Sequence, residues 1–214
     1  TALGVLPLFG AFIARTGGTR MSEFAGAFGS AETNLCVALF VLGVAGFGTK
    51  AGFVPFHVWL PIAHPVAPSP ISALMSGVVI KTGIYGLIRM ISWLPTLPGR
   101  CGAGLMVLSV VTGIVGILYA LGQRDLKRML AYSSVENIGI VGLAIAVAML
   151  GRTFDQPALV ILGLGGALLH ALNHSLFKGL LFLSAGAVLH GAGTGDVERL
   201  GGLARVTALN TAAF

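Results

Sequence analysis

Charged residues are scarce in this chain. Only 9% of its 214 residues are Asp, Glu, Lys or Arg, whereas ordinary globular domains carry about 25%. Together with 56% hydrophobic residues, this scarcity excludes a soluble single-core domain and predicts an integral membrane protein. The formal net charge of +6 is spread over short loops and forms no basic stripe, which argues against nucleic-acid binding and favours loops that face phospholipid headgroups.

Cysteine is nearly absent as well. Cys36 and Cys101 are the only two, and neither has the Cys-x-x-Cys or Cys/His spacing of an iron–sulfur cluster or a structural zinc site. The sequence also contains no glycine-rich phosphate loop and no nucleophile motif between a predicted strand and a predicted helix, the context in which such motifs function. We therefore expect no catalytic centre and no cofactor of the chain's own, and we expect both cysteines to pack between helices.

Long apolar runs make up most of the chain and predict an all-α bundle of transmembrane helices. The expected spans are about 1–14, 34–60, 71–91, 103–122, 129–150 and 158–190, with a further span starting at 206. Proline and glycine interrupt the second span near 51–55, which predicts a discontinuous helix. The last full span exceeds the roughly 20 residues that cross a bilayer, so it should tilt, project beyond the membrane or kink. Because both ends fall in apolar runs, we expect a longer polytopic chain.

The connecting segments predict the orientation of the bundle. The densest basic cluster is Arg124, Lys127 and Arg128, and the positive-inside rule places its side in the cytoplasm. The segment 63–70 contains three prolines and should form a stiff loop on that same side.

Two lysines fall deep within the predicted spans. Lys50 lies beside the expected helix break, and Lys81 lies ten residues into its span, about 15 Å deep at 1.5 Å per residue. Because a lysine near the bilayer centre costs roughly 2.5 to 3.5 kcal/mol, we expect both to serve ion movement. The alternative is that a lysine snorkels to an interface or locks two helices together, and Lys178 in particular is open to that interpretation.

A row of titratable groups accompanies these lysines. His170, His174 and Lys178 follow one another at four-residue intervals and therefore share one helix face. Imidazole titrates near neutrality and burial disfavours the charged form of lysine, so such a row can pass protons through a membrane. Glu136 either joins this path or packs between helices, bonded to a neighbouring serine or asparagine.

The histidines have other interpretations too. The pair His170 and His174 could hold a metal, but no acidic third ligand lies near it in sequence, so we expect no metal site. His57, beside the break, is expected to be a gate residue or an interfacial hydrogen-bonding group. We expect His64 to form hydrogen bonds at an interface in the same way.

Three long motifs resemble the antiporter-like membrane subunits shared by respiratory complex I, Mrp-type cation/proton antiporters and membrane-bound hydrogenases. They are KAGFVPFHVWLPIAHPVAPSPISALMSGVVIKTGIYGLIR, QRDLKRMLAYSSVENIGI and LLHALNHSLFKGLLFLSAGAVLH. Within that family, the chain looks most like the large membrane subunit of the formate hydrogenlyase or hydrogenase-4 type. The resemblance implies a bundle of about fourteen helices with two inverted repeats, each containing a discontinuous helix.

The resemblance also implies roles for individual residues. Lys50 matches the lysine of the broken helix and Lys81 the central lysine of the next helix. The stripe of His170, His174 and Lys178 matches the residues that link the two half-channels of the family. The glutamate that pairs with the broken-helix lysine, and the charged residue of the second repeat, have no counterpart in this sequence.

We therefore predict a proton-translocating subunit of a redox-driven oxidoreductase complex, of the hydrogenase or NADH:quinone oxidoreductase type. It would lie in the inner cell membrane of a bacterium or archaeon and would partner other membrane subunits and a soluble redox arm. Protons, or alternatively sodium ions, would be transported. The other possibilities are an Mrp-type sodium/proton antiporter subunit and a purely structural membrane anchor.

Overall fold

The computed structural model describes residues 1–25, 27–28, 32–94 and 97–202, and its main elements are eight α-helices in these ranges. The helices are α1 Ala2–Thr16, α2 Thr33–Ala51, α3 Trp59–Val66, α4 Ser69–Leu74, α5 Ile80–Trp93, α6 Gly99–Leu121, α7 Leu126–Thr153 and α8 Pro157–Ala192. Extended pairing in the described ranges is limited to one isolated bridge between Asp125 and Asp196. The all-α prediction is confirmed, whereas the span expected from 206 lies outside the described residues.

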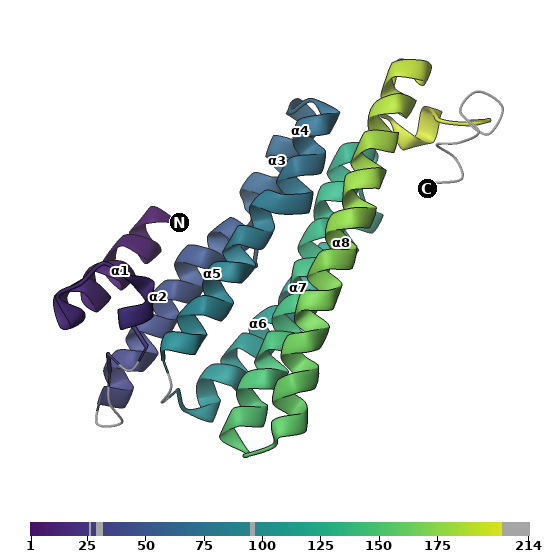
Figure 1. The fold of residues 1–214 in the computed structure, drawn as a ribbon. Helices are drawn as coiled ribbons and strands as arrows, with labels where there is room; N and C mark the ends of the chain where they lie inside the picture. Colours follow the sequence, from purple (N-terminus) through teal and green to yellow (C-terminus); the bar gives the residue numbers. More distant parts are fainter. Residues whose placement is uncertain (26, 29–31, 95–96, 203–214) are drawn as a thin grey trace.

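Five helical stretches are long and apolar enough to cross a membrane. They are Thr33–Val66, Ser69–Trp93, Gly99–Leu121, Leu126–Thr153 and Pro157–Ala192. These stretches run side by side, and the shorter α1 lies at one edge of the bundle next to α2 (Figure 1). The arrangement is that of a polytopic bundle, as the apolar runs predict.

The helix break lies where the sequence predicts it. Helix α2 ends at Ala51, Gly52 adopts a left-handed conformation with φ 95°, and Pro55 has no N–H with which to continue the helix. The backbone N–H of Val54 instead donates to Thr112 Oγ1 of α6 at 3.2 Å. Polar backbone freed at membrane depth is therefore satisfied by a neighbouring helix, as a bilayer requires.

The segment 63–70 is not the stiff loop that its prolines suggest. Helix α3 continues to Val66 and α4 begins at Ser69, so only Ala67 and Pro68 separate them. Pro70 occupies the first turn of α4, where a missing N–H breaks no helical hydrogen bond. The expected loop is therefore mostly helical, and this difference decides where His64 lies.

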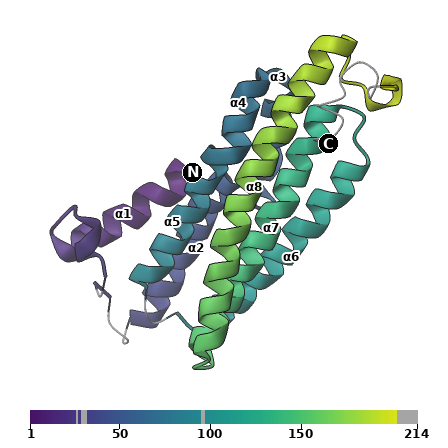
Figure 2. The same ribbon diagram turned by 45° about the vertical axis from the view of Figure 1, so that its right-hand side comes forward.

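Helices α7 and α8 form the centre of the site described below. Helix α7 packs against α3, α6 and α8, and α8 also packs against α4 and the π-helical segment Met75–Val79 that joins α4 to α5. Figure 2 shows α8 in front of the bundle, with α7 on one side of it and α4 and α5 on the other. A side chain on the inner face of α8 therefore meets residues from both neighbours.

Candidate functional site

The inner face of α8 carries buried polar side chains. His174 is 1% exposed and Lys178 is 2% exposed, while His170 is half-buried. The opposite face exposes leucines, namely Leu168, Leu169, Leu172, Leu176, Leu180 and Leu183. The row predicted from the four-residue spacing therefore points into the bundle and away from the exposed leucine face of α8.

Lys81 of α5 reaches this row. Its Nζ contacts His174 Nδ1 of α8 and donates to the backbone oxygen of Ser76. Ser76 belongs to the π-helical segment Met75–Val79, and such single-turn π segments are rare and frequent at functional sites. A protonated lysine offers only donors, so with an ammonium at Lys81 the Nδ1 atom of His174 is the acceptor and its Nε2 carries the ring proton.

The row continues from α8 to α7 through Asn137. The side-chain amide nitrogen of Asn137 donates to Glu136 Oε2 at 2.7 Å and to the backbone oxygen of Ser133 at 2.8 Å. Its Oδ1 atom is therefore an acceptor, and His170 Nε2 donates to it at 2.9 Å. The rings of His170 and His174 lie nearly parallel with their centroids 6.4 Å apart. Asn137 is thus the bonded neighbour of Glu136, and the choice between a place in the proton path and a packing role for Glu136 stays a prediction.

Lys178 is the third member of the row on α8, one turn beyond His174. Its Nζ donates to the Ser133 hydroxyl and to the Leu130 backbone oxygen, the latter at 3.2 Å, so the lysine is held by α7. Glu136 interacts with Lys178 electrostatically. The two do not form an ion pair, because the ion pairs among the described residues are Arg15–Glu32 and Arg124–Glu198. Lys178 does not snorkel, because its side chain is buried and bonded within the bundle. Its bonds to α7 fit the other half of that alternative, a lysine that locks two helices together, and its role in proton transfer stays a prediction.

Two of the predicted residues lie apart from the row. Lys50 is half-buried in the last turn of α2, and no hydrogen bond or ion pair connects it to another described residue. His57 follows the break, with its ring 6.2 Å from that of Tyr132, and its Nδ1 is buried with no hydrogen-bond partner in the described ranges. The roles given to both residues stay predictions.

His64 is a residue whose position the sequence did not reveal. It is 0% exposed and its ring stacks on Phe182 of α8, with centroids 4.5 Å apart. Neither ring nitrogen has a hydrogen-bond partner within the part of the chain that the structure describes. The complete burial contradicts the interfacial position expected for this residue. The four-residue interval between Leu60 and His64, both buried in α3, is the helical signal that the prolines concealed.

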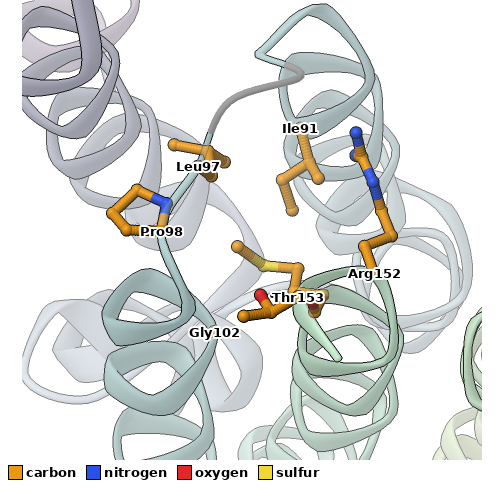
Figure 3. A pocket seen from close by; sticks show the side chains of 7 residues that line it. Ile91, Leu97, Pro98, Gly102, Arg152 and Thr153 are labelled. Atoms are coloured by element: carbon orange, nitrogen blue, oxygen red, sulfur yellow. Dashed lines mark hydrogen bonds between the residues drawn. The ribbon is translucent and has the colours of Figure 1, made fainter. Parts of the chain in front are cut away.

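The described residues contain no group of three His, Cys, Asp or Glu side chains that could hold a metal ion. The pocket in Figure 3, about 200 Å³ in volume, lies where α5 ends and α6 begins. It is lined by Ile91, Leu97, Pro98, Gly102, Met149, Arg152 and Thr153, none of which belongs to the polar row. The row from Lys81 to Glu136 is thus the chemically distinctive feature of the bundle, since Lys81, His174, His170 and Glu136 are titratable groups gathered between apolar helices.

Comparison with known proteins identifies the family of the chain. A family model described as "NADH:quinone oxidoreductase/Mrp antiporter, TM" matches residues 2–214. The chain belongs to this family. Among its relatives in Escherichia coli (strain K12), hydrogenase-4 component B is 49% identical over 82% of the chain, and formate hydrogenlyase subunit 3 is 46% identical over 78%. The resemblance inferred from the three motifs is therefore confirmed.

Solved structures show the fold of the family. An archaeal membrane-bound sulfane sulfur reductase matches 99% of this chain with a TM-score of 0.80, and the Mrp complex from Dietzia sp. DQ12-45-1b matches 97% with a TM-score of 0.78. Both are 24% identical to this chain. The matched region makes up 43% of the reductase chain and 36% of the Mrp chain. The chain spans 27% of hydrogenase-4 component B and 28% of formate hydrogenlyase subunit 3.

Proposed function

We propose that the chain is part of a proton-translocating membrane subunit of a redox-driven complex, and that the row from Lys81 to Glu136 carries its protons. The observation that supports this most directly is the contact between Lys81 and His174, two groups 93 residues apart that meet inside apolar helices. A lysine at this depth costs roughly 2.5 to 3.5 kcal/mol, which favours a functional reason for its presence.

The geometry suggests a sequence of transfers. The Lys81 ammonium gives a proton to His174 Nδ1, and the imidazolium that results releases a proton from Nε2. The ring separation of 6.4 Å exceeds a hydrogen bond, so transfer to His170 Nδ1 requires a bridging water. Asn137 orients His170 and Glu136 but carries no proton itself, because an amide does not titrate in this range. Transfer from His170 to Glu136 therefore also requires a bridging water.

Protons suit this row better than sodium ions. Lysine and protonated histidine are donors that repel a cation, and Glu136 supplies the row with a single carboxylate. Hard cations prefer several oxygen ligands around them. Lys50 and His57 would act separately, at the helix break, by changing the electrostatic field or the hydration near Lys81.

The partners follow from the relatives. Hydrogenase-4 component B and formate hydrogenlyase subunit 3 are named as parts of larger assemblies, so this chain would join other membrane subunits and a soluble redox arm. The basic end of the bundle would face the cytoplasm of a bacterium or archaeon. At this end Lys127 donates to the Ala67 oxygen at 2.8 Å, so the α3–α4 link and the basic cluster lie together.

The test measures proton translocation per electron transferred, in vesicles that contain the intact complex. Lys81→Met and His174→Leu should lower translocation by roughly 100-fold, the scale expected for losing a proton-transfer group. Asn173→Leu is the matched control, because Asn173 is an exposed polar residue next to His174 on the same helix. Unchanged translocation in Lys81→Met and His174→Leu would favour a structural anchor, and sodium-dependent transport would favour an antiporter.

A further inference from the structure

An apolar groove runs between α2 and α6 on the surface of the bundle, far from the polar row in sequence. Its volume is about 360 Å³. Helix α2 contributes Val37, Phe40, Val41 and Val44, and α6 contributes Leu105 and Leu108. Val41 is 58% exposed, so the groove is open at the surface of the described bundle, between two helices that are apolar and long enough to cross a membrane.

The groove has the length of an acyl chain segment. Its lining on α6 extends from Arg100 to Leu108, eight residue steps or about 12 Å along the helix. One leaflet contributes half of the hydrocarbon core, about 15 Å. The groove therefore covers most of the depth of one leaflet, parallel to the direction in which lipid chains lie.

A guanidinium group stands at the mouth of the groove. Arg100 lies in the first turn of α6, a turn without acidic residues, and its side chain is exposed. No hydrogen bond or ion pair joins Arg100 to the described part of the chain, whereas Arg15 pairs with Glu32 at 2.5 Å and Arg128 donates to the Pro61 oxygen. The free N–H groups at the start of α6 add positive potential at the same place.

We propose that this groove binds an anionic phospholipid, with its phosphate at Arg100 and one acyl chain between α2 and α6. Charge complementarity selects the headgroup class. A zwitterionic lipid would bring its own cation toward the guanidinium, whereas an anionic lipid such as phosphatidylglycerol presents only negative charge there. The lipid site shares no residue with the polar row, so the lipid proposal does not depend on whether the row carries protons.

Gly104 offers a direct way to close the groove. It lies on the α6 wall of the groove, and a Cβ atom added to it would meet no atom within 4 Å. Gly104→Phe should therefore place a bulky side chain in the groove, because its Cβ atom meets no protein atom. Gly165→Phe is the matched control, because Gly165 is an equally open helical glycine on α8, outside the groove.

The experiment uses the intact chain in its complex, purified in detergent and incubated with equal amounts of phosphatidylglycerol and phosphatidylcholine. Native mass spectrometry then counts the lipids retained. The unmodified chain should retain more phosphatidylglycerol, and Arg100→Gln should reduce this preference roughly fivefold, as expected for one arginine near an anionic headgroup. Arg100→Lys should keep the preference, and Gly104→Phe should lower the retention of both lipids.

Two results would overturn the proposal. The first is an unmodified complex that retains both lipids equally, or that is unaffected by Arg100→Gln. The second is a Gly104→Phe complex that fails to assemble while Arg100→Gln leaves lipid retention unchanged, which would mean that a protein segment fills the groove. Gly165→Phe, and Arg124→Gln at the opposite end of the bundle, should leave the retained lipids as they are.

Discussion

Gly163→Ala should disturb the polar row from a distance. Gly163 lies on the inner face of α8, seven residues before His170, where α7 and α8 pack closely. A Cβ atom added there would lie 2.7 Å from the backbone oxygen of Ala144 and from the backbone nitrogen of Ala148. Because both atoms are backbone, no side-chain rotation relieves the contact.

The size of the effect follows from these distances. To reach even the tight limit of 3.4 Å, α8 must move away from α7 by about 0.7 Å, the difference between 3.4 and 2.7 Å. The same movement carried to His170 would lengthen its 2.9 Å bond to Asn137 to about 3.6 Å, which is no longer a hydrogen bond. Overpacking of this kind destabilises proteins by about 1 to 3 kcal/mol.

The assay combines thermal unfolding of the intact complex in detergent with proton translocation in vesicles. Gly165→Ala and Gly166→Ala are matched controls on the same helix, because an added Cβ at either position meets nothing within 4 Å. They should be neutral or stabilise the helix by about 0.5 to 1 kcal/mol, since alanine has the higher helix propensity. If Gly163→Ala behaved like these controls in both measurements, the close α7–α8 packing would not govern the row.

Two further predictions concern the helix break and the buried histidine. Thr112→Val removes the hydroxyl that accepts the 3.2 Å hydrogen bond from the Val54 N–H at membrane depth, so the complex should lose about 1 to 3 kcal/mol of stability. An unchanged thermal midpoint would show that another group accepts this hydrogen bond. His64→Phe keeps the ring stack on Phe182 and removes two buried nitrogens without partners among the described residues, so the thermal midpoint should rise. A lower midpoint would show that the nitrogens bind a group in the assembled protein.

The helices and the inward row could be predicted from local patterns. Apolar runs long enough to cross a bilayer, broken by Gly52 and Pro55, determine the transmembrane helices and the interruption after Ala51. The four-residue spacing places His170, His174 and Lys178 on one face, because helical periodicity is a property of the chain itself. Each of these inferences needs only residues that are close together in sequence.

Contacts between helices were decided by the tertiary structure alone. Lys81 meets His174 because α8 packs against both α7 and the segment that joins α4 to α5, and Asn137 joins the row because α7 approaches α8 at Gly163. His64 is buried because α3 is a helix that faces α8. Sequence periodicity tells which side chains share a helix face, but which faces meet depends on how whole helices pack, and that packing is set by residues distant in the chain.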